Sequence, residues 1–321
     1  MIRRLSGGFA IGLVMGLAIF AFLNPYSFPD WWTLRSYTPS AEIEALAKNS
    51  FFTSEAERLF YVHDPKLQSS EEFMSNCPVE ETVVLGCYDG RGIYIFEVEE
   101  EQLDGIEEVT AAHEMLHAAY ARLSNSDQQE VVEWLNITFD QVSDQRIRDV
   151  VATYESQGQD VIDNELHSIL ATELEELPEF LEDYYSQYFT DRSQVVALSQ
   201  QYEAVFTALK DQVDNLDMQL SDLSASIRLL EASLETQGDT INTERERIST
   251  LLDNDDIPAY NQAIPGFNQS IDAYNQDFAQ LEVLIAEFND LVKQRNSIAT
   301  EQNNLVESID SNFSQQEGSG G

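Results

Sequence analysis

The sequence predicts a mostly helical α+β protein with a single N-terminal transmembrane helix, a small mixed domain and a long antiparallel coiled-coil hairpin. Three observations lead to this prediction. Residues 5–23 carry no charged side chain, residues 82–98 contain two apolar runs typical of strands, and apolar residues recur every seven positions from Tyr202 onward. We expect a transmembrane anchor at 1–23, a linker at 24–40, a folded domain at 41–190, a coiled-coil hairpin at 191–314 and a flexible tail at 315–321.

The N-terminal apolar run is long enough to cross a bilayer. It covers the 19 residues 5–23 and follows Arg3 and Arg4. The arginines predict a single-pass protein whose N-terminus is cytoplasmic and whose main part lies outside the cytoplasm. A cleaved signal peptide is the alternative, but no A-x-A pattern follows the run, which favours an uncleaved anchor. Trp31 and Trp32 follow closely enough to lie at the membrane interface.

Acidic residues dominate the charge of the chain. Asp and Glu number 58 against 17 Lys and Arg, and the formal net charge is −41. Such a charge repels the phosphates of nucleic acids and of anionic lipid headgroups, so neither is expected as a partner. The length of 321 residues leaves room for two domains and a sizeable core.

The first part of the domain combines helices with a β-hairpin. A helical pattern covers residues 40–61, and two strand-like segments, 82–88 and 93–98, flank an Asp-Gly-Arg-Gly turn. Cys77 and Cys87 are the only cysteines of the chain. Outside the cytoplasm, two cysteines this close in sequence are expected to form a disulfide. A two-thiol metal site is the alternative, although the tight Cys-x-x-Cys spacing is missing.

The strongest chemical signal is the pentapeptide His113-Glu114-Met115-Leu116-His117. The chain has only four histidines, and two of them lie here. Positions four apart share one face of a helix, so both imidazoles can bind one metal ion. Glu114 then lies beside the open coordination position, where it can act as a general base. Asp104 and Glu107 form a capping-box pattern that predicts a helix start just upstream. The alternative is an amphipathic helix with ordinary polar histidines.

The H-E-x-x-H arrangement resembles the zinc-binding signature of the zincin metallopeptidases. No histidine follows His117 by six residues, which excludes the metzincin pattern. Residues 160–177 instead resemble the second helix of the gluzincins, in which a glutamate completes the zinc site. The resemblance covers about residues 90–175. It implies Zn²⁺ bound by His113, His117 and a third ligand, and a peptidase with Glu114 as its base.

Three residues of the second helix are candidates for the third ligand. Asn164-Glu165 matches the asparagine–glutamate step of the gluzincins, although Ile169 stands where many of them have Asp or Asn. Glu173 lies near the middle of an apolar face, where an unpaired carboxylate is costly; a metal ion or a salt bridge would each resolve that cost. His167 can bind the metal, or act as a catalytic residue that stabilises the oxyanion opposite the general base. We prefer Glu165, then Glu173, then His167.

Beyond residue 190 the sequence has the seven-residue period of a coiled coil. Two rows of apolar residues run from Tyr202 and are interrupted at Gln237 and Glu244, which predicts a weaker segment there.

Three repeats over residues 257–276, each beginning with Ile and ending in Asn-Gln, continue the period. Pro258 and Pro265 forbid one uninterrupted helix, so we expect the chain to reverse within 253–265. An antiparallel hairpin with arms of ~70–90 Å is the economical arrangement. A dimeric rod is the alternative. We expect the hairpin to act as a spacer, as an arm that docks a protein partner or a second copy, or as a lid over the site.

Together these features predict a membrane-anchored zinc metallopeptidase that hydrolyses proteins or peptides outside the cytoplasm. The hairpin before the histidines resembles the layout of zincins, in which an edge strand precedes the active-site helix. Residues 93–98 are therefore expected to pair with an extended peptide substrate. The alternative is a non-enzymatic envelope scaffold with a catalytically dead zincin-like domain and a coiled coil that docks partners.

Overall fold

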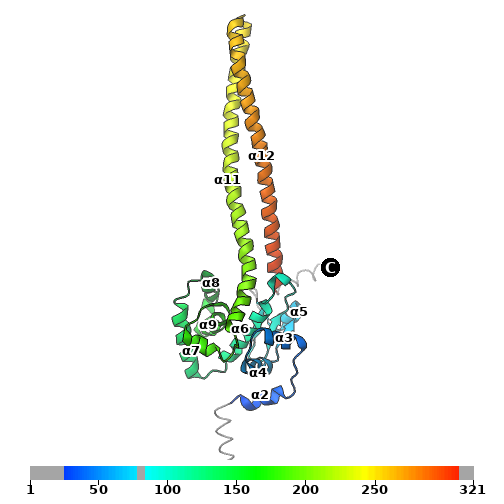
Figure 1. Cartoon of the computed structure of the whole chain (residues 1–321), viewed down its shortest axis with the longest axis vertical. Coiled ribbons are helices and arrows are strands. Elements are labelled where there is room, and N and C mark those ends of the chain that lie inside the picture. Colours follow the sequence, from blue (N-terminus) through cyan, green and yellow to red (C-terminus); the bar gives the residue numbers. More distant parts are fainter. Residues whose placement is uncertain (1–24, 78–83, 311–321) are drawn as a thin grey trace, which may run out of the picture. The chain divides into compact units, whose positions relative to one another are not determined.

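The computed structural model describes residues 25–77 and 84–310. Helices account for most of these residues, and one small sheet accompanies them (Figure 1). The helices are α2 (Ser27–Leu34), α3 (Ala41–Asn49), α4 (Ser54–Val62), α5 (Ser70–Asn76), α6 (Ile106–Tyr120), α7 (Asn125–Phe139), α8 (Gln145–Thr153), α9 (Gln159–Glu173), α10 (Glu179–Tyr185), α11 (Arg192–Asp253) and α12 (Ile257–Ile309). The strands are β1 (Lys66–Gln68), β2 (Gly86–Tyr88) and β3 (Ile93–Phe96), and short 3₁₀ turns cover Glu101–Leu103 and Glu155–Gln157.

The chain divides into two compact units. The first comprises residues 1–205 with 305–321, and the second comprises residues 206–304. Within the described ranges, no helix is long and apolar enough to cross a membrane. The expected anchor at 1–23 and the expected tail at 315–321 lie outside the described residues. Within the expected linker at 24–40, residues Ser27–Leu34 form helix α2.

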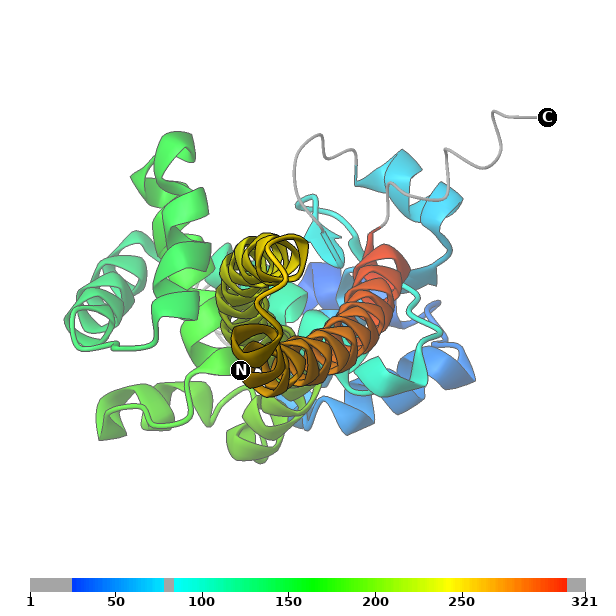
Figure 2. The same ribbon diagram turned by 90° about the horizontal axis from the view of Figure 1, so that it is seen from above.

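Helix α6 lies at the centre of the first unit. Its Ala111, Ala112, Met115 and Leu116 side chains are fully buried, and the small alanines allow neighbouring helices to approach closely. Figures 1 and 2 show α7, α8 and α9 to one side of this unit and α3, α4 and α5 to the other. A helix buried on nearly every side is held rigidly, so α6 can fix the positions of the side chains it carries.

The start of α6 differs from the predicted capping box. The helix begins after Gly105, whose φ of +95° is a left-handed conformation. A side chain at this position would also meet Leu198, whose Cδ2 would lie 2.9 Å from a Cβ. The Glu107 carboxylate accepts a hydrogen bond from the Val98 N–H at 2.8 Å, so it bonds to Val98 and not to the backbone of Asp104. The capping box of Asp104 and Glu107 was therefore a wrong prediction.

The helical pattern at 40–61 forms two helices. Ser40 caps α3 by accepting from the Ile43 N–H, and Thr53 caps α4 in the same way from the Ala56 N–H. Between them Phe51 adopts a left-handed φ of 56°, which ends the first helix.

The predicted β-hairpin is confirmed, but it belongs to a three-stranded sheet of order β1-β3-β2. Strand β1 pairs in parallel with β3, and β2 pairs antiparallel with its other side. Strand β3 is therefore central, and the expectation that residues 93–98 form the edge strand that receives a peptide was wrong. The three residues of β1 were too few for an alternating pattern to predict a strand.

The predicted disulfide is confirmed. Cys77 and Cys87 are bonded, with their Cα atoms 6.1 Å apart, and the bond joins the end of α5 to β2. Cys77 packs in a small apolar cluster with Phe73 and Phe96.

The second unit is an antiparallel helical hairpin. Helix α11 has 62 residues and α12 has 53, and the chain reverses at 254–256, where Asp255 has a φ of 60°. The reversal lies in the predicted interval, but α12 runs through Pro265. Pro258 falls in the first helical turn, where its missing N–H is tolerated, and Pro265 removes one backbone hydrogen bond without ending a helix of this length.

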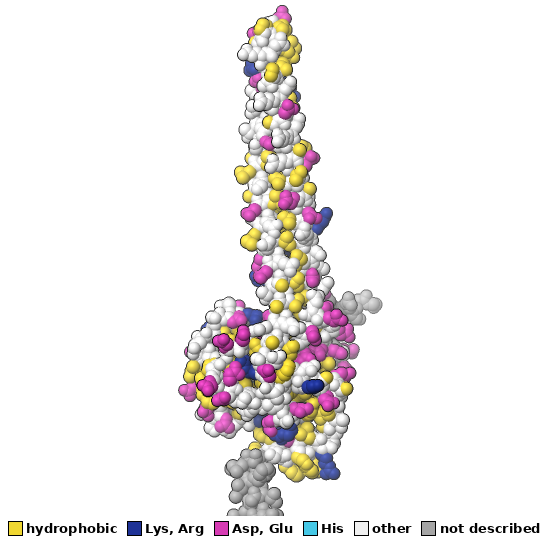
Figure 3. All heavy atoms as spheres, viewed as in Figure 1, with side chains coloured by type: hydrophobic (Ala, Val, Ile, Leu, Met, Phe, Trp, Pro, Cys, Tyr) yellow, Lys and Arg dark blue, Asp and Glu magenta, His cyan; other side chains and the backbone are white. Residues whose placement is uncertain are grey.

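Two polar contacts join the arms of the hairpin. Gln237, where the apolar row lapses, donates from Nε2 to Asp277 Oδ2 at 2.6 Å, and Arg295 contacts Asp217 at 3.1 Å. Helix α11 continues without interruption past Gln237 and Glu244. Acidic side chains are spread over the visible faces of both units (Figure 3).

Candidate metal centre

Helices α6 and α9 pack against each other and bring three side chains of metal-ligand type together. The Nε2 atom of His113 lies 3.4 Å from Glu165 Oε2, and the Nε2 atom of His117 lies 3.6 Å from Glu165 Oε1. Ligand atoms of all three residues lie within 4.8 Å of one another. The structure therefore places the preferred candidate, Glu165, opposite the two histidines of α6.

The distances from the two imidazoles to the two oxygens of the Glu165 carboxylate resemble the spacing of neighbouring zinc ligands. Zinc bonds of ~2.0–2.1 Å hold neighbouring ligand atoms about 3.3–3.4 Å apart. The two nitrogen–oxygen distances, 3.4 and 3.6 Å, are close to that value. Two imidazoles and one carboxylate form a ligand set common in catalytic zinc sites, which leave the fourth position open.

The two imidazoles differ in protonation because they differ in their charged neighbours. Burial opposes a positive charge on His113. The hydrogen bond to Glu165 and the negative charges of Glu114 and Glu165 outweigh burial and raise the pKa of His113 to about 9. Burial and the charge of His113 lower the pKa of His117 to about 4. Burial opposes ionisation of Glu165, yet His113 and His117 hold its pKa below the ordinary value. Without a metal, the shifts make His113 cationic and His117 neutral at neutral pH.

Glu114 lies beside this group and is only 5% exposed. Burial raises the pKa of its carboxyl to about 7, with His113 opposing the shift and Glu165 adding to it. Its Oε2 atom has no hydrogen-bond partner among the described residues. A buried carboxyl oxygen without a partner is costly, and it marks a position where water or a substrate group is expected.

Strand β2 closes tightly over Glu114 at Gly86. A Cβ atom added at Gly86 would lie 2.8 Å from Glu114 Cγ and 2.6 Å from Thr110 Cγ2. These distances are shorter than van der Waals contact, so only glycine lets the strand approach the helix this closely. Strand β2, which carries the disulfide-bonded Cys87, therefore confines the Glu114 side chain.

Three further residues contact the ligands, and the sequence did not single them out as site residues. Tyr154, just after α8, hydrogen-bonds to the Glu165 carboxylate and helps to lower its pKa. Ser168 Oγ lies 3.4 Å from His117 Nδ1, and the Asn164 side chain opposes the lowering of the His117 pKa. Ser168 stands one turn after Glu165, so helical spacing could have found it. Tyr154 lies outside the regular helices, and no spacing rule points to it.

The structure does not bring Glu173 into the ligand group. Its carboxylate pairs with Arg146 at 2.6 Å, and the same guanidinium contacts Glu203 at 3.3 Å. The sequence left a metal ion or a salt bridge as the partner of this carboxylate, and the structure contains the salt bridge. In this structure Glu173 therefore faces Arg146 and not the two histidines, and its role as third ligand stays a prediction.

His167 also lies away from the ligand group. Its ring is fully buried, and its Nε2 atom is 2.9 Å from the Tyr184 hydroxyl. Burial and the charges of His117 and His113 lower the pKa of His167 to about 3, so the ring is neutral. The ring is not exposed to solvent in this structure, and its roles as metal ligand or oxyanion stabiliser stay predictions. It packs instead among tyrosine rings, those of Tyr120, Tyr184, Tyr185 and Tyr188.

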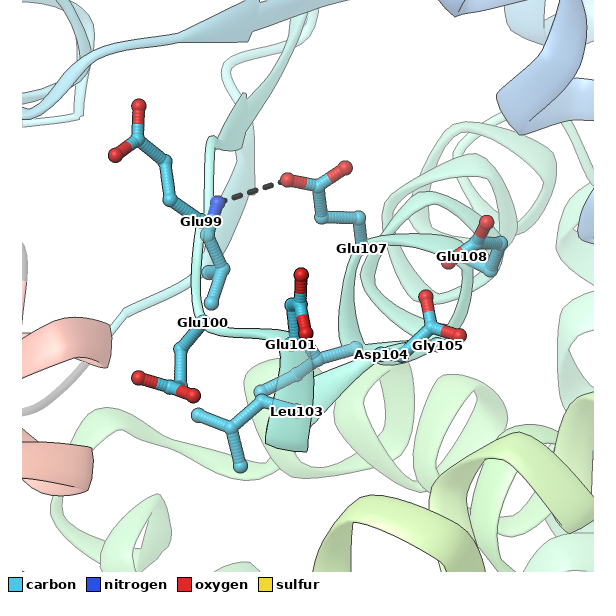
Figure 4. Close-up of a pocket in the computed structure, with 10 residues that line it drawn as sticks. Glu99, Glu100, Glu101, Leu103, Asp104, Gly105, Glu107 and Glu108 are labelled. Atoms are coloured by element: carbon cyan, nitrogen blue, oxygen red, sulfur yellow. Dashed lines mark hydrogen bonds between the residues drawn. The ribbon is translucent and has the colours of Figure 1, made fainter.

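A separate hollow of about 540 Å³ lies at the N-terminal end of α6 (Figure 4). Its lining consists of acidic and apolar residues, and the Glu107 carboxylate, drawn in Figure 4, hydrogen-bonds to the Val98 N–H. The lining contains no imidazole, thiol or base paired with a nucleophile, so this hollow offers no catalytic arrangement.

Comparisons with models of known protein families, with curated proteins and with solved structures gave no significant match. The interpretation of the site therefore depends on its own geometry. Two imidazoles and a carboxylate converge, and a buried carboxyl with a raised pKa lies beside them. This combination defines a candidate metal centre with a buried carboxyl group beside it.

Proposed function

We propose that this protein is a membrane-anchored, zinc-dependent peptidase that hydrolyses peptide bonds outside the cytoplasm. The observation that carries the proposal is the convergence of His113, His117 and Glu165, with Glu114 beside them. The extracytoplasmic location is supported by the disulfide, a bond that persists in oxidising compartments. It is also supported by the uncharged run at residues 5–23, which follows two arginines.

Each residue of the site has a separate role in this proposal. His113, His117 and Glu165 would hold the zinc ion, which when bound lowers the pKa of water and polarises a carbonyl group. Glu114 takes a proton from the attacking water and passes it to the leaving amine. A pKa of about 7 suits a carboxyl that must both accept and release a proton near neutral pH.

The contacts of the ligands with their neighbours support the same arrangement. Ser168 contacts His117 at Nδ1, which leaves the Nε2 atom directed at Glu165. Tyr154 hydrogen-bonds to the Glu165 carboxylate. Hydrogen bonds of this kind orient metal ligands and set the tautomer of an imidazole.

Strand β2 is the better candidate for binding an extended substrate, because it is an outer strand of the sheet formed by the described residues. The Leu85 carbonyl accepts from the Phe96 N–H, and the Asp89 backbone N–H donates to the Gly92 carbonyl. The backbone N–H and C=O groups of the odd-numbered residues of β2 therefore face β3. The backbone groups of Gly86 then point away from β3, to the outer edge of the sheet formed by the described residues. Since Gly86 lies against Glu114, a peptide paired there would run beside the general base.

Replacing Glu114 with glutamine tests the proposal. The variant should keep one zinc ion per chain but lose hydrolysis of a mixed peptide library, followed by mass spectrometry, by about 10²–10⁴-fold. Glu108→Gln is the matched control, because Glu108 lies on the same helix, contacts Asn49 and should leave hydrolysis unchanged. Equal hydrolysis by Glu114→Gln and the unmodified chain would contradict the proposal.

A non-enzymatic envelope scaffold is the second candidate function. Apolar side chains exposed on the helical hairpin favour it, since Leu229, Val283 and Met218 are 75%, 64% and 62% exposed. Such side chains suit the docking of a partner. Absence of hydrolysis by the zinc-loaded, unmodified chain on the same peptide library would favour this function.

A further inference from the structure

Helix α2 presents a continuous aromatic surface to the outside of the first unit. Phe28, Trp31 and Trp32 are 69%, 54% and 63% exposed. Their rings are in contact, with centroids 6.1 Å apart for Phe28 and Trp31 and 6.3 Å apart for Trp31 and Trp32. The spacing i, i+3, i+4 places all three on one helix face. Large exposed aromatic clusters of this kind mark interaction surfaces.

The opposite face of α2 is fastened to the unit that carries the candidate metal centre. Asp30 is only 2% exposed. Its carboxylate accepts hydrogen bonds from Nη1 and Nη2 of Arg122, at 2.9 and 3.1 Å, and from Nη1 of Arg58 at 3.0 Å. The Arg122 guanidinium also lies over the Tyr26 ring, 4.6 Å from its centroid. Charge-assisted bonds to a buried carboxylate fix geometry strongly. Arg122 follows α6 directly, so α2 is tied to the helix that carries both histidines.

The position of α2 in the chain indicates what covers its aromatic face. The uncharged run of 19 residues ends at Leu23, just before Ser27 begins the helix. Tryptophan side chains favour the headgroup region of a bilayer, because one ring combines apolar area with an N–H donor. A helix face rich in tryptophan and phenylalanine beside such a run therefore fits a lipid surface.

The charge around α2 agrees with this partner. The chain as a whole has a net charge of −41, but Arg35 lies over the Trp31 ring at 5.7 Å and Arg58 stands beside the helix. Figure 3 shows hydrophobic side chains together with Lys and Arg at the end of the first unit where Figure 1 labels α2. Two arginine side chains therefore lie beside the aromatic face, which favours its contact with phospholipid headgroups.

We propose that the aromatic face of α2 lies in the headgroup region of a phospholipid bilayer and holds the first unit at a fixed orientation to the membrane. The inference rests on the membrane attachment that is part of the proposed function, and it does not depend on peptidase activity. It makes α2 a rigid connection where the sequence predicted a linker, and it fixes the candidate metal centre relative to the lipid surface.

Tryptophan fluorescence tests the contact with lipid, because the chain has only three tryptophans. The full chain carrying Trp134→Phe leaves Trp31 and Trp32 as the emitters. In phosphatidylcholine vesicles brominated at shallow or deep acyl positions, their emission should shift to shorter wavelength. Shallow bromines should quench it roughly twofold more than deep ones, as expected at headgroup level. In the control chain, which carries both Trp31→Phe and Trp32→Phe, Trp134 is the emitter. Trp134 packs on Phe180, and its emission should not be quenched by the brominated lipids.

The outcomes separate this inference from the proposed function. A full chain that floats with the vesicles but whose Trp31 and Trp32 emission is unquenched would overturn the inference, with water or a protein covering the face instead. A chain that does not float would overturn the membrane attachment and this inference together, and would leave the zinc site to its own test.

The fixed orientation has a separate test in the same vesicles. Asp30→Asn removes the buried charge that pairs with Arg58 and Arg122. Amide hydrogen exchange within α2 should become roughly tenfold faster or more. Equal exchange rates in the variant and the unmodified chain would overturn the rigid connection.

Discussion

Replacing Glu165 with glutamine tests the electrostatics of the site in the absence of metal. The pKa of His113 is raised from 6.5 to about 9, since Glu165 and Glu114 outweigh the effect of burial. A shift of this size corresponds to about 3 kcal/mol in favour of the charged imidazole. Without the Glu165 charge, burial should dominate, and the pKa of His113 should fall to 6.5 or below. The fall would exceed two pH units.

The assay is nuclear magnetic resonance of the chelator-treated full chain labelled at histidine, which gives four ring signals to follow against pH. Glu173→Gln is the matched control, because that carboxylate contributes the smallest of the charges acting on His113 and pairs with Arg146. The control should leave the pKa of His113 near 9. A pKa that stays near 9 in Glu165→Gln, or that falls equally in Glu173→Gln, would refute the reasoning.

The same ion pair links the stability of the metal-free protein to pH. The folded-state pKa of His113 is raised above 6.5, so its contribution is fully present below pH 6.5. That contribution is lost as the pH rises through about 9.

Three further substitutions test the contacts around the site. Gly86→Ala forces a Cβ against Glu114 and should lower the free energy of unfolding in urea by about 1–3 kcal/mol, and an unchanged midpoint would contradict the tight contact. Arg192→Ala removes a buried guanidinium that donates to three carbonyl groups at the end of α9, and should lower the free energy of unfolding by about 3–5 kcal/mol. Lys210→Ala, which removes an exposed ion pair, should leave the free energy of unfolding unchanged. Tyr154→Phe should weaken zinc affinity about 10–100-fold in competition with a chelator, and an unchanged affinity would remove its orienting role.

Local patterns predicted much of the fold. The four-residue spacing of His113 and His117 determines that they share a helix face wherever the helix packs. The turn between two apolar runs predicted the hairpin of β2 and β3, and the seven-residue period predicted the long helical hairpin. Each of these features depends on residues close in sequence or on a long repeated pattern.

The choice among the third-ligand candidates depends on tertiary packing. Glu165 and Glu173 lie two turns apart on α9, and both were compatible with the sequence pattern. Arg146, from another helix, pairs with Glu173 and leaves Glu165 to face the histidines. No spacing rule joins Arg146 to Glu173.

The contact between strand and helix was equally beyond sequence patterns. Gly86 looked like an ordinary strand glycine, yet it is where β2 closes on Glu114. The pairing of β1 with β3, which makes β3 central, depends on a segment of three residues. Non-local contacts of this kind are decided by packing and leave little periodic signal.

We propose that His113, His117 and Glu165 together bind one zinc ion. Elemental analysis of the full chain, purified without chelator, tests it most directly. We expect one zinc ion per chain in the unmodified protein and in Glu173→Ala, and loss of zinc in His113→Ala and Glu165→Ala. Absence of zinc from the unmodified protein, or full zinc in Glu165→Ala, would contradict it.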